Sequence, residues 1–168
     1  MSAMLIIVMG LPGSGKSYFA RRLAKQLGAV YVGSDELRRK MGLLGKYKIE
    51  NRISVYNEMI KTSKELLIKG EDVVMDGTFY LQFMRDMAIC MAKTLSFEVF
   101  IILVEAEDTL IGQRLSMPRE DSEADLAVHY QIKGEFDPLS EPHLLIQSTN
   151  ENLEENLEKA KHFLEKVN

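Results

Sequence analysis

The chain has 168 residues, of which 46% are hydrophobic and 27% charged, and its formal net charge is −4. This length fits one domain with a proper core, and the negative charge argues against a broad nucleic-acid-binding surface. The single cysteine, Cys90, has no partner for an internal disulfide, which favours a reducing compartment. No hydrophobic run approaches the ~20 residues of a membrane span. The N-terminus also lacks the features of a signal peptide, so we expect a cytoplasmic protein.

Hydrophobic runs of strand length alternate with segments of helical periodicity along the chain. Strands are expected at residues 4–9, 30–32, 72–76, 97–104 and 144–146. Helices are expected at residues 17–27, 35–41, 50–69, 81–95, 107–115, 123–133 and 151–167. This alternation is typical of a doubly wound α/β fold with three αβα layers and a mostly parallel five-stranded sheet. We expect one domain over residues 1–168.

The clearest motif lies between the first expected strand and the first expected helix. It reads Gly-Leu-Pro-Gly-Ser-Gly-Lys-Ser and fits G-x-x-x-x-G-K-[ST], the phosphate-binding P-loop. Lys16 supplies a cation for the β- and γ-phosphates of a nucleotide, and Ser17 offers a hydroxyl to Mg²⁺. The expected nucleotide-binding residues are Gly10, Leu11, Pro12, Gly13, Ser14, Gly15, Lys16, Ser17, Tyr18 and Arg114. ATP is favoured over GTP, because the chain has neither a D-x-x-G nor an N-K-x-D sequence.

Two carboxylates follow the second and third expected strands, where ligands bind in open α/β sheets. Asp35 can accept the proton of an attacking hydroxyl. Alternatively, Ser34 or Asp35 caps the next helix. Asp76, followed by Gly77 and Thr78, can hold Mg²⁺ or serve as a turn residue. Both carboxylates are therefore expected at the same edge of the sheet as the P-loop.

Several arginines are candidates for binding anionic groups. Arg38 lies one helical turn after Asp35 and could hold a phosphate or carboxylate of an acceptor. Arg52 and Arg85 are candidates of the same kind. The locally basic segment from residue 35 to 52 is either a solvated helix face or an anion-binding site.

A polar segment at about residues 112–122 is expected to act as a lid. Arg114 and Arg119 flank the start of its loop. A loop that brings arginines over ATP excludes water and stabilises charge on the transferring phosphoryl group. The alternative is a pair of solvated arginines.

These residues together resemble the P-loop kinases of the polynucleotide-kinase-like group, which includes phage-type polynucleotide kinase and small ATP-binding proteins of the AAA_33 type. The resemblance covers roughly residues 4–150 and implies a parallel core of kinase-type strand order. It also implies a general base at Asp35 and an acceptor contact at Arg38. Arg114 and Arg119 would be the lid arginines.

The resemblance extends to the end of the third expected strand, with one departure. Asp76 and Thr78 match an Asp-Thr pair of the group, with Gly77 between them as an insertion or a shift.

The sequence predicts an ATP-dependent kinase that transfers the γ-phosphoryl group to a hydroxyl acceptor. The acceptor is a small molecule or a nucleic-acid 5′-hydroxyl, although the net charge does not favour nucleic acid. An ATP-binding switch or scaffold and a simple ATPase acting through a partner are the alternatives. The expected catalytic residues are Lys16, Asp35, Arg114 and Arg119. The expected acceptor-binding residues are Asp35, Arg38, Arg52, Thr78 and Arg85. Ser17 and Asp76 are expected to hold Mg²⁺.

Overall fold

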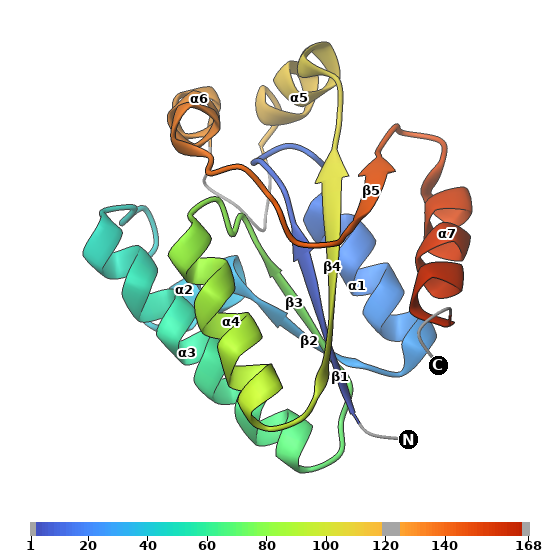
Figure 1. Ribbon diagram of the computed structural model, residues 1–168. Helices are drawn as coiled ribbons and strands as arrows, with labels where there is room; N and C mark the ends of the chain where they lie inside the picture. The colour runs from blue at the N-terminus through green and yellow to red at the C-terminus, as the bar shows by residue number, and fades with distance from the viewer. Residues whose placement is uncertain (1–2, 119–124, 166–168) are drawn as a thin grey trace.

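A parallel sheet runs through the middle of the computed structural model, which describes residues 3–118 and 125–165 (Figure 1). Its strands are β1 (Met4–Met9), β2 (Val30–Gly33), β3 (Val73–Gly77), β4 (Glu98–Glu105) and β5 (Leu144–Gln147). Their order across the sheet is β2-β3-β1-β4-β5, and every pairing is parallel. The expected α/β fold is confirmed, and the described sheet is wholly rather than mostly parallel.

Helices cover both faces of the sheet, so the fold has three layers (Figure 1). One face carries α1 (Lys16–Leu27) and α7 (Leu153–Glu165). The other face carries α3 (Ile49–Ile68) and α4 (Gln82–Thr94). The remaining helices, at the carboxyl-end edge of the sheet, are α2 (Ser34–Lys40), α5 (Asp108–Leu115) and α6 (Leu126–Glu135). The loops at this edge connect strands to helices on opposite faces, and a ligand-binding crevice forms there in folds of this kind.

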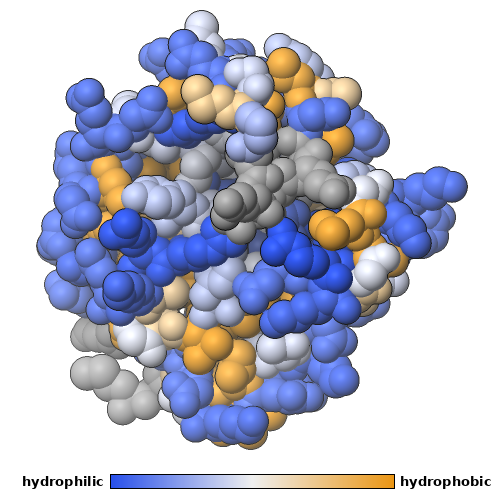
Figure 2. Space-filling model, turned by 180° about the vertical axis from the view of Figure 1, so that it is seen from behind, coloured by the Kyte–Doolittle hydropathy of each residue, from blue (hydrophilic) through white to orange (hydrophobic). Residues whose placement is uncertain are grey.

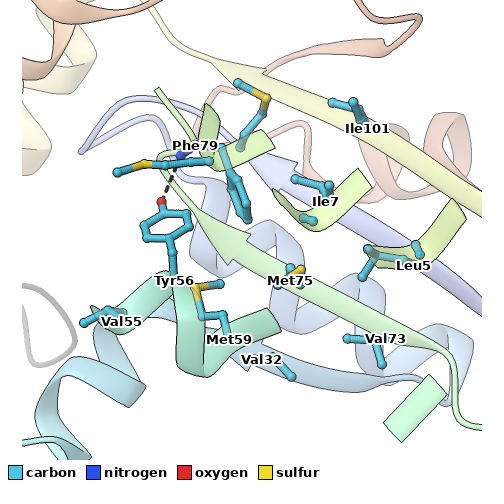
Figure 3. Close-up of a cluster of buried hydrophobic side chains, with 14 of the residues drawn as sticks. Leu5, Ile7, Val32, Val55, Tyr56, Met59, Val73, Met75, Phe79 and Ile101 are labelled. Carbon is cyan, nitrogen blue, oxygen red and sulfur yellow. Dashed lines mark hydrogen bonds between the residues drawn. The ribbon is translucent and has the colours of Figure 1, made fainter. Parts of the chain in front are cut away.

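The core is divided between the two faces of the sheet. In β1, Leu5, Ile7 and Met9 pack with the α3–α4 cluster, whereas Ile6 and Val8 pack with the α1–α7 cluster. Figure 3 shows part of the first cluster. Burial on both faces explains why β1 is a continuous hydrophobic run with no polar alternation.

The hydrophobic ring of Tyr56 lies inside this first cluster, edge-on to Phe79 at 4.9 Å between ring centroids. Its hydroxyl accepts a hydrogen bond of 3.0 Å from the Phe79 backbone N–H, drawn as a dashed line in Figure 3. This bond ties α3 to the segment that follows β3. The segment contains Thr78, one of the expected acceptor-binding residues.

The start of α2 differs from the expectation that Ser34 or Asp35 caps the helix. The N-cap residue is Gly33, which is extended, and no side chain makes a capping hydrogen bond. Ser34 is already helical, and the carboxylate of Asp35 accepts a hydrogen bond from Arg38 instead. The cap prediction is therefore wrong. Because Asp35 does not cap the helix, its carboxylate stays with the side chains at the edge of the sheet.

The surface is largely polar where Figure 2 views it, and hydrophobic side chains lie there in separate small groups. Such scattered hydrophobic exposure is normal for a folded protein. Across residues 3–118 and 125–165, no helix has both the length and the hydrophobicity to cross a membrane.

Candidate functional site

The segment between β1 and α1 turns so tightly that two of its residues must be glycine. Gly15 has φ +89°, and a Cβ atom there would lie 2.8 Å from Oγ of Ser148 and 3.1 Å from Nη1 of Arg114. A Cβ atom on Gly10 would clash with the carbonyl oxygen of Val104. Backbone N–H groups at the start of α1 are thus open to an anion, as the P-loop motif requires.

A cavity of about 720 Å³ lies against this loop. Its size is that of a typical small-molecule or cofactor site. The expected nucleotide-binding residues that line it are Gly13, Gly15, Lys16, Ser17, Tyr18 and Arg114. Residues after β5 close its far side, namely Ser148, Thr149, Asn150 and Asn152.

The other expected nucleotide-binding residues do not line this cavity. Leu11 and Ser14 line a separate cavity of about 260 Å³ between the loop and α5. Pro12 lines a third, smaller cavity of about 50 Å³. Gly10 lines none of these three cavities.

Arg114, near the end of α5, connects the P-loop to the segment after β5. Its Nη1 donates to the Gly13 carbonyl at 3.2 Å, and its Nη2 donates to Ser148 Oγ and Asn150 Oδ1, each at 3.2 Å. Partial burial lowers the pKa of the Arg114 guanidinium. The expected partner Arg119 lies outside the described residues, as does the rest of the lid from residue 119.

Asp35 lies where the large cavity meets the cavity of about 50 Å³. Both cavities are lined by Lys16, Ser17 and Asp35. Three further expected site residues line only the smaller one, and these are Arg38, Arg52 and Thr78. The structure thus brings together the P-loop, the end of β2, the start of α3 and the segment after β3.

Arg38 and Arg52 are buried charges, each with only 4% of its surface exposed. Arg38 Nη1 donates to Asp35 Oδ1 at 3.1 Å, and Arg52 Nε donates to the Tyr47 carbonyl at 2.7 Å. Both guanidinium groups lie over the Tyr47 ring, at 4.9 and 5.4 Å from its centroid. A cation over an aromatic face is stabilised by the ring quadrupole, so Tyr47 helps to keep the two charges at the small cavity.

Arg85 has a different environment, and it lies apart from the other expected acceptor-binding residues. It is fully buried, and it lines neither the large nor the small cavity. Its guanidinium donates to the carbonyls of Phe79 and Pro138, each at 2.8 Å, and to Gln82 Oε1 at 2.7 Å. These bonds tie the segment after β3 to the segment before β5, so Arg85 stabilises the fold.

Asp76, near the carboxyl end of β3, has surroundings that suit a divalent cation. Its Oδ2 accepts a 2.5 Å hydrogen bond from the Tyr31 hydroxyl, whereas its buried Oδ1 has no hydrogen-bond partner among the described residues. Burial raises the pKa of Asp76, and nearby Lys16 and Ser17 lower it. A carboxylate oxygen without a partner beside a P-loop serine fits the all-oxygen coordination of Mg²⁺.

Sequence reasoning missed several residues that shape the site. Tyr31 bonds to Asp76, and Tyr47 stacks against two arginines. His129 of α6 is buried, with its Nδ1 3.0 Å from the Pro12 carbonyl of the P-loop. Tyr47 could have been predicted from the sequence, because it is an aromatic residue within the basic segment 35–52. Contacts of Tyr31 and His129 depend on the packing of elements far apart in the chain.

Two relatives with similar sequences each match less than half of this chain. An uncharacterized protein of Mycobacterium tuberculosis is 36% identical over 87 residues, which is 45% of this chain and 18% of that protein. A putative adenylate kinase of Pyrococcus furiosus is 35% identical over 74 residues, which is 44% of this chain and 40% of that protein. The matched segments thus span less than half of either relative.

Solved structures match the fold over nearly the whole chain. The APS kinase CysC of Mycobacterium tuberculosis, in complex with AMPPNP and APS, has a TM-score of 0.75 at 17% identity and covers 98% of both chains. A gluconokinase from Sinorhizobium meliloti has a TM-score of 0.70 at 15% identity, covering 99% of this chain and 93% of that one. The chain therefore has a kinase-like P-loop fold. A family model described as an AAA domain matches residues 5–139, most of the chain, and the protein belongs to this family, AAA_33.

Proposed function

We propose that the protein is an ATP-dependent kinase that transfers the γ-phosphoryl group to a hydroxyl acceptor. One observation carries this proposal: Lys16, Ser17 and Asp35 line both the large cavity and the small cavity beside it. A nucleotide in the large cavity and an acceptor reaching from the small one would meet at these three side chains. A carboxylate at such a junction is suited to receive the acceptor proton.

The nucleotide side of the proposal rests on the P-loop and its neighbours. The loop N–H groups and Lys16 would bind the β- and γ-phosphates. Arg114 would neutralise charge on the transferring group, and Arg119 is proposed for the same role from the lid. The nucleoside would lie towards Tyr18 and residues 148–152, which line the rest of the large cavity.

Ser17 and Asp76 are the residues that would hold Mg²⁺. The unpartnered Oδ1 of Asp76 supports this assignment. The metal ion neutralises negative charge on the phosphate oxygens. Tyr31 orients the carboxylate through its hydrogen bond to Oδ2.

In the proposed reaction, the acceptor oxygen forms a bond to the γ-phosphorus while the bond to the β–γ bridging oxygen breaks. ADP leaves with the bridging oxygen, and the acceptor proton passes to the Asp35 carboxylate. Arg38, Arg52 and Thr78 would bind the acceptor from the small cavity. Exclusion of water matters because water would otherwise accept the phosphoryl group. The fold does not identify the acceptor, since related folds serve different substrates.

The first test compares the wild-type protein with Asp35→Asn, using ATP labelled at the γ-phosphate, Mg²⁺ and a panel of alcohols. Loss of a general base lowers rates by about 10²- to 10⁴-fold, and ATP affinity should stay within about 2-fold. Glu36→Gln is the matched control, because Glu36 is the next residue of α2 and its side chain is 47% exposed.

Three results would contradict the proposal. Full activity in Asp35→Asn would remove its central residue. Release of phosphate by the wild type at the same rate with and without any acceptor would indicate a simple ATPase. ATP binding without turnover would indicate a switch or scaffold.

A further inference from the structure

Two buried arginine side chains line the small cavity. Arg38 reaches it from α2 and Arg52 from the start of α3. Arg52 lies 5.4 Å from the centroid of the Tyr47 ring and 5.2 Å from that of Tyr80. The stacked rings hold the arginine side chains in place before any ligand arrives.

These guanidinium groups retain hydrogen-bonding capacity. Within residues 3–118 and 125–165, Arg38 Nε and Arg52 Nη2 are both buried and have no hydrogen-bond partner. Asp35 pairs with Arg38, and no carboxylate is found paired with Arg52 in the same part of the chain. Burying an unpaired charged donor is costly, so such groups are normally matched by a ligand or by water. The small cavity therefore has surplus positive charge and free donors.

The size of the cavity limits what can neutralise this charge. It measures about 50 Å³. A single water needs roughly 10–15 Å³ by this measure, so there is room for about four oxygen atoms. One tetrahedral oxyanion would fill that space. Thr78 lines the same cavity, and its hydroxyl, 3.3 Å from that of Tyr56, adds a neutral hydrogen-bonding group.

We infer that the cavity between Arg38, Arg52 and Thr78 binds a tetrahedral oxyanion that is part of the acceptor, so that the acceptor is a small alcohol bearing a phosphate or sulfate group. This inference rests on the proposed function, because it names the acceptor of the same reaction. The anion would be anchored beside Asp35, which also lines the cavity, and the hydroxyl of the same molecule would extend towards Lys16.

A nucleic-acid acceptor would use a different surface. Exposed lysines on and after α2, including Lys40, Lys46 and Lys48, are the residues that a phosphate backbone would contact first. They do not line the small cavity. The two acceptor classes therefore depend on different side chains and can be separated by substitution.

The test uses inorganic phosphate as the probe and the whole protein saturated with ADP, aluminium fluoride and Mg²⁺, so that the γ-phosphate position of the P-loop is filled as well. Isothermal titration should find one phosphate site per chain. Arg52→Gln should weaken it at least about 10-fold, the equivalent of one lost hydrogen bond between charged groups. Thr78→Val should weaken it about 3-fold through loss of a neutral hydrogen bond. Lys48→Gln removes an exposed charge of the same segment and should change the affinity less than 2-fold.

Thermal unfolding of each variant shows whether it folds. Thr78→Val is included because Arg52 is buried and its replacement could destabilise α3. Absence of phosphate binding to the ADP-saturated wild type would overturn the inference. So would folded Arg52→Gln and Thr78→Val proteins that bind phosphate as tightly as the wild type.

Transfer assays separate this inference from the proposed function. Sulfate and phosphate should inhibit transfer competitively with the acceptor, and Arg52→Gln should raise the acceptor KM. A further assay measures transfer to a 5′-hydroxyl oligonucleotide. A rate that falls in Lys46→Gln and Lys48→Gln but not in Arg52→Gln would overturn the inference, and the proposed kinase function would still stand. Phosphate binding at the cavity with no transfer to any alcohol would refute the kinase, and with it the acceptor, but would leave the oxyanion site itself standing.

Discussion

The two cavities that meet at Asp35 are built in different ways. Part of the large cavity is formed by the P-loop and the start of α1, and the rest by Arg114 and by residues of β4, β5, α7 and the segment between β5 and α7. The small cavity takes side chains from α2, α3, α6, the P-loop and the segment after β3. Its charged groups are buried and stacked on aromatic rings, whereas those of the large cavity are more open.

This difference has a consequence for specificity. A loop that binds phosphate through its backbone is insensitive to most side-chain changes, so one fold can keep its nucleotide while the acceptor changes. The small cavity presents buried charged side chains instead, so a single substitution of Arg38 or Arg52 can alter it. We therefore expect substitutions in the large cavity to reduce all transfer, and substitutions in the small cavity to act selectively on the acceptor.

Lys16→Ala should have the largest effect. Removal of a cation that contacts the transferring group costs about 10³-fold or more in rate. Circular dichroism and thermal unfolding should show an intact fold, because Lys16 is not part of the hydrophobic core. Lys25→Ala, an exposed lysine of the same helix, is the matched control and should be unchanged. A Lys16→Ala protein with near-normal activity would show that the large cavity is not a phosphate site.

Arg114→Gln should come next, with a fall of about 10²-fold in kcat measured by phosphoryl transfer. Arg114→Lys should recover little, because a lysine cannot bond to Gly13, Ser148 and Asn150 at the same time. The acceptor KM should stay constant in both variants. A change confined to the acceptor KM would mean that Arg114 acts on the acceptor. The large and small cavities would then not have the separate roles proposed for them.

The fold and the P-loop could be predicted because both depend on local or periodic features of the sequence. Hydrophobic runs identified β1, β3 and β4, and the glycine pattern identified the loop. The small cavity could only be predicted in part. Arg52 and Arg85 are each the fourth residue of their helix, so the sequence presents them alike. Only the packed structure shows that backbone carbonyls surround Arg85 while Arg52 faces a cavity.

Tyr31→Phe tests a contact that lies behind the large cavity. The change removes the hydrogen bond to Asp76 Oδ2 and leaves the ring beside Arg21. Loss of a bond that orients a metal ligand typically weakens metal affinity by about 10-fold. The Mg²⁺ concentration for half-maximal transfer should rise by that factor, with kcat at saturating Mg²⁺ nearly unchanged. If the required Mg²⁺ concentration did not change, the hydrogen bond from Tyr31 would have no effect on Mg²⁺ binding.

The smallest expected effect concerns stability and pH, and it again depends on Asp76. Burial raises the pKa of Asp76 in the folded protein above its ordinary value near 4, so the folded state binds more protons than the unfolded state. The contribution of Asp76 to stability is therefore present at low pH and is lost as the pH rises through the raised pKa.

Without nucleotide or Mg²⁺, the unfolding free energy of the wild type relative to Asp76→Asn should fall as the pH rises above about 4. Chemical denaturation across this range measures the difference, with Glu71→Gln, an exposed carboxylate just before β3, as the control. Mg²⁺ and ADP should reverse the trend, because a bound cation stabilises the ionised carboxylate. A difference that stays constant with pH would mean that water already satisfies Oδ1 of Asp76. The metal assignment would then lose the observation that supports it.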